Sequence, residues 1–568
     1  MTIISIDLGT TNSVCAVWKK GQATLIPNRL GNFLTPSVVS VDSTDENTLI
    51  VGQVAKARLR SHPMQTVAVF KRDMGSSRTY RLAQHTFTAP ELSALVIQSL
   101  KQDAEIFLGQ TVHEAVISVP AYFNDMQRKA TIQAAEIAGL NVRRLINEPT
   151  AAAIAYGLHD AADGARYVIL DLGGGTFDVS VVEYFSGVIE VHASAGDNFL
   201  GGEDFLEYFA NAYANAHGIS LQKLPLTSKQ TLYTQLEHYK NTLSKEESVH
   251  IPSLLPEQTE TWTVTRQDYG HWVKPLINRM MIPIERALQD ARLNPDDIDR
   301  VILVGGASRM AHVRALASRL FKKIPLASLD PDLVVAMGAA IQAGLSEQDA
   351  ALDDVVLTDV CPYSLGTSTQ NPNSNDPGMQ LFSPIIERNQ TIPTSRVQTY
   401  TTVRDQQTTV EFSIYQGEAR YVKNNIKLGE ITVPVPAAPA GTETVDARFS
   451  YDMNGLLEVD ITVCSTQLSR QMTIINSADK LSEADINASR QKLAQLKFHP
   501  RENEEIALLL ARADACYQNS LAEQRHQINI QMQLFEGELN TQDPLRIQRA
   551  KLKFEELLAA WENNRFFD

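Results

Sequence analysis

Two short segments of the chain repeat one set of groups that can hold phosphate and a metal ion. Residues 4–13 read ISIDLGTTNS and residues 169–178 read ILDLGGGTFD, so each β-forming run ends in Asp-Leu-Gly and continues with small residues. Glycine lets backbone N–H groups approach a phosphate closely, and threonine hydroxyls add further donors. A carboxylate at a strand end can hold Mg²⁺, mostly through water. Two such hairpins that face each other would clamp the β- and γ-phosphates of a nucleotide from both sides.

This pattern predicts a phosphate and metal site, with Asp7 and Asp171 at the metal, largely through water. The predicted nucleotide ligands in the two hairpins are Asp7, Gly9, Thr10, Thr11, Asn12, Gly173, Gly174, Gly175 and Thr176. A third glycine segment, Gly305-Gly306, follows the β run Val301–Val304 and is expected to pack against the nucleoside. A single Asp-Leu-Gly is usually an ordinary turn, but two copies on hairpins favour phosphate binding. The sequence has no Gly-Lys dipeptide and no Gly-x-Gly-x-x-Gly that opens a helix, which excludes the other common nucleotide motifs.

The periodicity divides the 568 residues into three regions, as expected for a chain too long for one core. Short β runs alternate with helical stretches such as 127–138 and 281–291 up to about residue 345, which predicts an α/β domain. From Cys361 the residues alternate as in strands, with a hairpin signal at Asn454-Gly455, which predicts a β-sandwich. After Leu481 the pattern is helical. The predicted boundaries are 1–350, a linker at 351–360, 361–478 and 479–568.

Composition narrows the function classes. The net charge of −15 argues against nucleic acid as a partner, because nucleic-acid binding depends on basic surface. No uncharged apolar run approaches the roughly 18 residues that a membrane span needs. The four cysteines lie far apart, and the first seven residues read as a strand rather than a signal peptide, so we expect a reducing, cytoplasmic compartment.

Beyond these patterns, the sequence resembles the DnaK-type heat-shock chaperones, within the actin and sugar-kinase superfamily. The segments that carry the resemblance are 6–13 (IDLGTTNS), 119–125 (VPAYFND), 146–153 (INEPTAAA), 171–178 (DLGGGTFD), 200–205 (LGGEDF), 304–306 (VGG), 364–366 (SLG), 416–418 (QGE) and 454–455 (NG). The resemblance implies an actin-like ATPase domain of duplicated ribonuclease H-like subdomains, an all-β peptide-binding sandwich and a short α-helical lid. The short C-terminal region makes the chain most similar to the divergent HscC branch of bacterial chaperones.

The resemblance also assigns residues to ATP hydrolysis. These are Lys71, Glu148, Asp171, Asp178 and Thr176. An ammonium at Lys71 would offset charge on the transferring phosphoryl group, whereas a lone lysine is more commonly a solvated surface residue. Asp171 or Asp178 would orient the attacking water. The implied cofactors are ATP or ADP with Mg²⁺, and K⁺ is a further candidate.

The rest of the implied nucleotide site lies beyond the two hairpins. Its residues are Gly201, Gly202, Glu203, Glu237, Lys240, Asn241, Ser244, Gly305, Gly306, Ser308, Arg309 and Asp332. Asn241 departs from the family pattern, which has an arginine that stacks on adenine at this position.

Coupling and peptide binding are likewise implied by the resemblance. The residues implied at the domain interface are Pro120, Arg128, Arg144, Val356, Leu357 and Asp359; those implied in the peptide cleft are Leu365, Val403, Val410 and Phe412. The apolar linker segment is expected to dock on the ATPase domain in one nucleotide state, and the alternative is a first edge strand of the sandwich. Arg128 and Arg144 could equally be exposed charges, and the cleft residues could be ordinary core.

The implied partners are unfolded or native client polypeptides and a J-domain co-chaperone, which would dock near Arg144, Asn147 and Thr150. Nucleic acid and membrane are not expected, and the need for an exchange factor stays open. A small-molecule kinase or a filament former of the same superfamily would share the phosphate hairpins. Neither would need a β-sandwich with the matched linker, so a chaperone is favoured.

Asn241 yields a first prediction, which is loose nucleotide binding. A guanidinium over an aromatic face contributes on the order of 0.5–2 kcal/mol, so its absence costs roughly two- to thirtyfold in affinity. We expect Asn241→Arg to slow the release of a fluorescent ADP analogue several-fold in a stopped-flow measurement. An unchanged release rate would mean that the adenine pocket is built differently.

Overall fold

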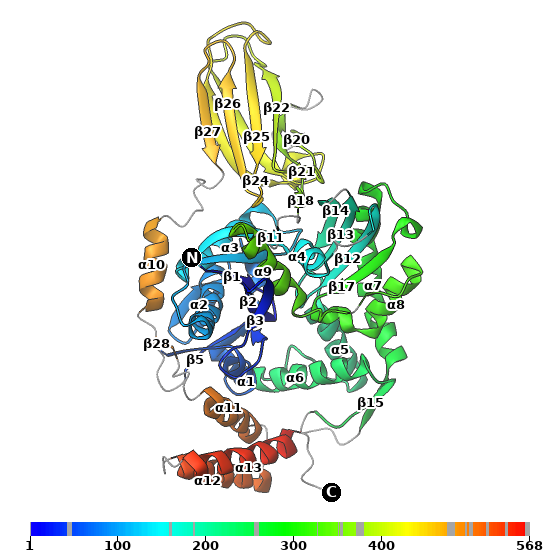
Figure 1. Ribbon diagram of the computed structural model, residues 1–568, viewed down its shortest axis with the longest axis vertical. Coiled ribbons are helices and arrows are strands. Elements are labelled where there is room, and N and C mark those ends of the chain that lie inside the picture. Colours follow the sequence, from blue (N-terminus) through cyan, green and yellow to red (C-terminus); the bar gives the residue numbers. More distant parts are fainter. Residues whose placement is uncertain are drawn as a thin grey trace.

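The computed structural model describes residues 2–42, 48–157, 162–185, 188–254, 261–326, 328–349, 352, 356–370, 380–473, 483–494, 497–498, 504–518, 522–539 and 544–562. Figure 1 shows a large α/β body with the β-sandwich at one end and the last helices at the opposite end. All four cysteines are free, and no helix in the described ranges is long and apolar enough to cross a membrane.

Two sheets of the first domain repeat one arrangement around the two predicted hairpins. The first has the order β11-β10-β1-β2-β3 with β4 on β2, and the second contains β17-β12-β13-β14. In each sheet the hairpin strands are antiparallel (β1–β2, β12–β13), and a parallel strand (β10, β17) lies beside the first of them. The strands are β1 (Ile3–Asp7), β2 (Asn12–Lys19), β3 (Gln22–Ile26), β4 (Thr35–Pro36), β10 (Glu114–Val119), β11 (Asn141–Asn147), β12 (Ala165–Leu172), β13 (Phe177–Phe185), β14 (Val188–Asp197) and β17 (Arg300–Val304). The duplication read from the sequence is therefore present in the fold.

Helices α4 (Glu148–Ala155) and α9 (Val334–Ser346) cross between the two sheets and share a core with both. Their approach is so close that a Cβ at Gly338 would lie 1.8 Å from the carbonyl oxygen of Ala151. Glycine at this position therefore sets the spacing of the two helices, and with it the spacing of the sheets.

The remaining helices of the first domain share cores with its sheets. They are α1 (Gln53–Ser61), α2 (Ala89–Leu108), α3 (Asp125–Ile137), α5 (Gly202–Ala216), α6 (Leu226–Leu243), α7 (Arg266–Asp290) and α8 (Ala311–Phe321). Helices α2 and α3 share a core with the first sheet, α5 to α8 with the second, and α1 with strands β5 (Val38–Val41) and β6 (Thr48–Val51). Capping boxes at Thr88, Asn124 and Thr265 begin α2, α3 and α7 by satisfying free backbone donors. The sequence predicted helix only from residue 281, but α7 begins at Arg266 and contains two internal prolines, Pro275 and Pro283.

Smaller sheets complete the domain. They are formed by β5 (Val38–Val41), β6 (Thr48–Val51) and β7 (Thr66–Ala68), by β8 (Thr79–Leu82) with β9 (His85–Thr88), and by β15 (Ser248–Ile251) with β16 (Trp262–Thr265).

The second domain is a sandwich of two four-stranded sheets, as predicted. One has the order β20-β19-β23-β24 and the other β22-β25-β26-β27. The strands of the two sheets are β19 (Leu365–Thr369), β20 (Leu381–Ile386), β22 (Thr394–Thr401), β23 (Thr409–Gln416), β24 (Ile426–Pro434), β25 (Thr444–Tyr451), β26 (Leu457–Val463) and β27 (Ser469–Thr473). A further short strand of this domain, β21 (Thr391–Ile392), lies outside both sheets. The predicted Asn454-Gly455 turn joins β25 to β26, and Gly455 has the positive φ of 74° that glycine tolerates.

The linker strand β18 (Val356–Val360) belongs to both domains. Its first residues pair in parallel with β14 of the first domain, from Val188↔Val356 to Glu190↔Thr358. Its last residues pair antiparallel with β21, at Asp359↔Ile392 and Val360↔Thr391. The docked-linker interpretation describes this conformation. The edge-strand alternative is wrong here, because β21, the partner of β18, belongs to neither four-stranded sheet of the second domain. Residues 353–355 of the predicted linker lie outside the described residues.

The C-terminal region lies along the first domain rather than over the sandwich (Figure 1). It contains α10 (Glu483–Ala494), α11 (Glu504–Gln518), α12 (Ala522–Leu539) and α13 (Pro544–Glu562). Leu493 of α10 is buried in the core of the first sheet, and Leu508 of α11 packs in the apolar cluster that contains Val54 of α1. The helical pattern missed β28 (Lys497–Phe498), which pairs in parallel with β6. Helices α11, α12 and α13 share a core of their own around Phe554.

Candidate functional site

A cavity of about 830 Å³ lies where the two glycine hairpins meet. Its lining contains most of the residues predicted for the nucleotide and for hydrolysis: Asp7, Gly9, Thr10, Thr11, Asn12, Lys71, Glu148, Asp171, Gly173, Gly174, Thr176, Gly202, Glu203, Glu237, Lys240, Asn241, Ser244, Gly305, Gly306, Ser308, Arg309 and Asp332. Three predicted residues, Gly175, Gly201 and Asp178, are not in the lining. The fold thus brings together segments that are up to about 300 positions apart in the chain.

The two hairpins face each other at contact distance. A Cβ at Gly174 would lie 1.9 Å from the hydroxyl oxygen of Thr11, and one at Gly175 would lie 2.7 Å from that of Thr10. Gly201 fits beneath this contact, because its Cβ would lie 2.5 Å from the backbone of Gly174. Gly175 and Gly201 therefore permit the close approach of backbone that the clamp requires, although neither lines the cavity.

Four acidic side chains lie at the centre of the site: Glu148, Asp171 and Asp178 are buried, and Asp7 is partly buried. Burial, with repulsion from Glu148, raises the pKa of Asp7 to about 7 and that of Asp178 to about 7. The pKa of Asp171 is also raised, by burial and then by Glu148, Asp178 and Asp7. One carboxylate oxygen of Asp171, one of Asp178 and the hydroxyl of Thr11 are buried without a hydrogen-bond partner in the described residues.

These orphaned oxygens and the clustered acids fit a hydrated cation that carries charge into the cavity. Within the described ranges, no group of three or more His, Cys, Asp or Glu side chains is arranged to hold a metal ion directly. The prediction that Asp7 and Asp171 hold Mg²⁺ largely through water stays a prediction.

Lys71 is buried against the acids. It lies in a 3₁₀ turn (Phe70–Asp73), and its ammonium donates to Glu148 Oε1 at 2.9 Å. The exposed alternative considered for this lysine is wrong, since its side chain is 5% exposed. Glu148 is the first residue of α4, directly after Asn147. The ion pair therefore connects the cavity to the helix that crosses between the sheets.

The nucleoside end of the cavity is lined by α6 and the third glycine segment. The buried Lys240 ammonium donates to the carbonyl oxygen of Gly202 at 3.1 Å, and burial lowers its pKa. Arg309 is held by two carboxylates, with Nη2 2.8 Å from Asp332 Oδ2 and a second bond to Asp330. Asp330 was not predicted from the sequence, although it lies only two residues before Asp332.

This arrangement can be compared with known proteins. A family model described as Hsp70 protein matches residues 3–84 and 77–563, which is nearly the whole chain. The chain belongs to the Hsp70 family. Members of the family are ATPases that bind ATP or ADP with Mg²⁺, and they act as chaperones on client polypeptides with J-domain co-chaperones. Assignment to the HscC branch stays a prediction.

In this Hsp70 chain the linker carboxylate lies in a prepared polar site of the first domain. Asp359 Oδ2 accepts hydrogen bonds from Asn147 Nδ2 at 2.7 Å and from the Thr150 hydroxyl at 2.9 Å. Burial raises the pKa of Asp359 above its ordinary value, and these two hydrogen bonds offset part of that increase. Arg144 lies within electrostatic reach of the Asp359 carboxylate. Burial lowers the pKa of Arg144, and the negative charge of Asp359 partly offsets this decrease. The neighbours Asn147 and Glu148 thus bind the linker and the Lys71 ammonium, respectively.

Arg128 supports the same site from below. It is buried, not exposed as the sequence alternative had it, and it donates to Asn147 Oδ1 at 2.7 Å and to the carbonyls of Ala121 and Phe123. Pro120 begins the turn that presents these carbonyls, since Phe123 N donates to Pro120 O. Both predicted interface residues therefore shape the surface on which β18 docks.

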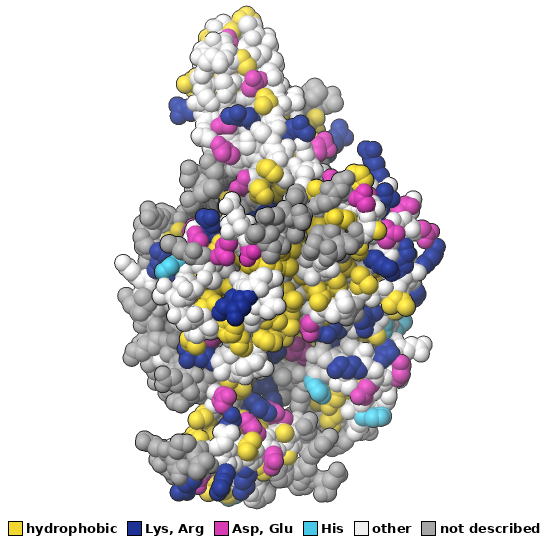
Figure 2. Space-filling view, in the orientation of Figure 1, with side chains coloured by type: hydrophobic (Ala, Val, Ile, Leu, Met, Phe, Trp, Pro, Cys, Tyr) yellow, Lys and Arg dark blue, Asp and Glu magenta, His cyan; other side chains and the backbone are white. Residues whose placement is uncertain are grey.

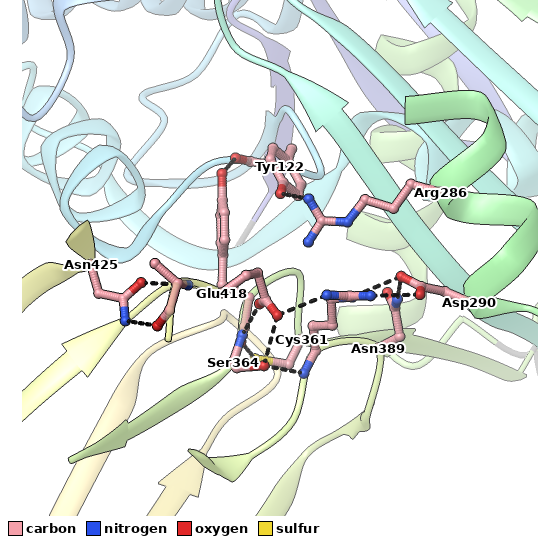
Figure 3. A network of polar contacts seen from close by, with 11 residues as sticks. Tyr122, Arg286, Asp290, Cys361, Ser364, Asn389, Glu418 and Asn425 are labelled. Atoms are coloured by element: carbon pink, nitrogen blue, oxygen red, sulfur yellow. Dashed lines mark hydrogen bonds and ion pairs between the residues drawn. The ribbon is translucent and has the colours of Figure 1, made fainter. Parts of the chain in front are cut away.

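A second contact between the domains was not predicted from the sequence. Arg388 of the sandwich forms a two-bond ion pair with Asp290 of α7, at 2.8 Å for each bond, and also binds Glu418 (Figure 3). Asn389 donates to the same Asp290 carboxylate. These hydrogen bonds to two carboxylates raise the pKa of Arg388 above its ordinary value. No local sequence signal identifies such a pair, because its partners are about 100 positions apart.

The four residues predicted for the peptide cleft do not share one environment. Leu365 is fully buried and Phe412 nearly so, both within the sandwich core. Val410 is partly buried at the edge of that core, and Val403 is 55% exposed after β22. For Leu365 and Phe412 the core interpretation describes this conformation, and their role in peptide binding stays a prediction. Residues 371–379, between β19 and β20, lie outside the described residues.

Lys71 carries the next prediction. We expect Lys71→Ala to abolish single-turnover ATP hydrolysis and to leave ATP binding largely intact, because the ammonium acts mainly on charge that develops in the transition state. Lys101→Ala on α2, far from the cavity, is the matched control. Rapid-quench hydrolysis and equilibrium titration with a fluorescent nucleotide measure the two effects. Hydrolysis that survives within about tenfold would remove Lys71 from catalysis.

Proposed function

We propose that this chain is a molecular chaperone that binds and releases extended apolar segments of client proteins, driven by ATP binding and hydrolysis. The observation that carries the proposal is the double pairing of β18, which joins β14 of the first domain to β21, a short strand of the second domain that leads into β22. A change in the first domain that displaces this strand would act directly on the sandwich. This coupling favours a chaperone over a small-molecule kinase, because a kinase would not need a second domain of this kind.

The hydrolysis step is assigned to residues of the cavity. Bound Mg²⁺ would neutralise charge on the nucleotide phosphates. Asp7 and Asp171 would hold it, and the Thr10 and Thr11 hydroxyls with the facing glycines would bind the phosphate oxygens. Lys71 is kept in place by Glu148, so that it can offset charge on the transferring group. The unpaired oxygen of Asp171 or of Asp178 would orient the attacking water.

Peptide binding is assigned to the part of the sandwich around Val410, at the start of β23. An extended peptide gains affinity from main-chain hydrogen bonds to exposed strand edges and specificity from a side-chain pocket. Val410 on β23 pairs with Val433 of β24 and leaves part of its side chain outside the core. The nearby Val403 is exposed and Thr367 is buried and polar, so we propose a narrower or more polar preference than a fully apolar pocket gives.

The proposal extends to partners and location. A J-domain would dock near Arg144, Asn147 and Thr150, whose side chains lie at or around the linker carboxylate in this conformation. Such a partner would compete with Asp359 for the same donors and so affect docking of β18. Membership of the HscC branch, a cytoplasmic location and K⁺ as a second ion are further parts of the proposal.

The test is ATP-dependent binding of a labelled apolar peptide to the full chain, followed by fluorescence anisotropy. We expect tight binding with ADP, fast release after ATP is added, and loss of binding in Val410→Phe, because a packed pocket has no space for an aromatic ring. Val397→Phe is the matched control, since Val397 is 56% exposed on β22 of the other sheet. Peptide affinity that is equal with ADP and ATP would contradict the chaperone cycle. Unchanged affinity in Val410→Phe would show that the cleft lies elsewhere.

A further inference from the structure

One arginine at the nucleoside end of the cavity is held by two carboxylates. Arg309 ends the 3₁₀ turn Gly306–Arg309, and its Nε and Nη2 atoms donate to Asp332 Oδ2 at 3.1 Å and 2.8 Å. Nη2 also donates to Asp330 Oδ1. The hydrogen bonds of a guanidinium lie in its plane, so these bonds use one edge of the group and leave its flat faces available to stack on an aromatic ring.

Asp330 binds more than the arginine. Its Oδ1 atom also accepts a hydrogen bond from the backbone N–H of Asp332 at 2.9 Å, which closes a local turn through the side chain. Its carbonyl oxygen accepts from the backbone N–H groups of Leu333 and Val334, at 3.0 Å each, where α9 begins. Asp330 therefore joins the start of α9, the turn before it and the Arg309 guanidinium.

This turn is also fixed against the third glycine segment. Gly305 N donates to the carbonyl oxygen of Pro331 at 2.9 Å, and a Cβ at Gly306 would lie 2.4 Å from Asp332 Oδ1. The side chain of Arg309 is 49% exposed, yet two carboxylates restrict its rotation. A free arginine loses rotational entropy when it covers a ligand, and a restricted one loses less. The two carboxylates thus prepare Arg309 before a nucleotide binds.

We infer that Asp330 is a positioning residue for nucleotide binding: together with Asp332 it holds the Arg309 guanidinium in an orientation that can cover the base. The inference rests on the proposed function and deepens it, because it takes the cavity as the nucleotide site. Asn241 of α6 also lines the cavity and carries no guanidinium. Stacking on the base is then left to Arg309, and its preparation by Asp330 offsets part of the affinity that Asn241 costs.

The test is Asp330→Asn in the full chain. This change removes the negative charge and keeps an oxygen that can accept from the N–H of Asp332, so the turn should persist. Asp330 and Arg309 are about half exposed, so their pairing contributes modestly. We expect release of an ADP analogue with a fluorescent label on the ribose to accelerate about two- to fivefold in a stopped-flow measurement.

Asp296→Asn is the matched control. Asp296 forms an exposed ion pair with Lys322 at 2.9 Å, and neither residue lines the cavity. Its release rate should equal that of the unaltered chain.

Two further measurements separate positioning of Arg309 from simple support of the turn. In an Arg309→Ala background, Asp330→Asn should not change the release rate further, because no guanidinium remains to be held. Ribose 5′-triphosphate has no base, so in competition titrations it should bind the unaltered chain and Asp330→Asn equally well. A distorted turn would instead weaken the binding of both compounds.

Three outcomes would overturn the inference. They are unchanged ADP release in Asp330→Asn, an equal acceleration in the Arg309→Ala background, and weaker competition by ribose 5′-triphosphate. An unaltered chain that binds no ADP would contradict the proposed function itself, and the inference would fall with it.

Discussion

The backbone pairing of β18 with β14 is the interaction on which the two-domain arrangement depends. The edge of β14 presents unpaired N–H and C=O groups, and three residue pairs along β18 cover them. So short a ladder is not strong alone. The burial of Asp359 adds a second contact. Its carboxylate gives up hydrogen bonds to water and accepts hydrogen bonds from Asn147 and Thr150 instead. Because burying a carboxylate is costly unless its partners are in place, docking depends on the position of these two side chains.

Those side chains are tied to the nucleotide cavity by the chain itself. Asn147 binds the linker and the adjacent Glu148 binds Lys71, so β11 ends and α4 begins between the two sites. Several acids of the cavity surround the Lys71 ammonium, and their mutual repulsion favours a cation that enters with the nucleotide. If Glu148 moves when the charge in the cavity changes, the adjacent Asn147 would move with it. The ion pair at Arg388 closes the interface on its other side.

The sequence predicted what is encoded locally or repeated. The two Asp-Leu-Gly hairpins, the alternation of β23 and the turn at Asn454-Gly455 each appear where expected. It could not predict contacts between distant segments, such as Arg388 with Asp290 or α11 against α1, because no spacing rule links them. For the same reason Arg128 read equally well as an exposed charge, although it is buried beneath Asn147. Leu365 and Phe412 carried the opposite ambiguity, since a pocket residue and a core residue look alike in one sequence.

The proposed chaperone cycle requires the nucleotide to control docking of β18, which amide hydrogen exchange of residues 356–360 in the full chain would measure. With saturating ATP these amides should be protected by their pairing with β14, and with saturating ADP they should exchange at least about tenfold faster, which corresponds to about 1.4 kcal/mol of docking free energy. Equal protection of these amides with ATP and with ADP would contradict this mechanism, because docking of the linker strand would then not depend on the nucleotide.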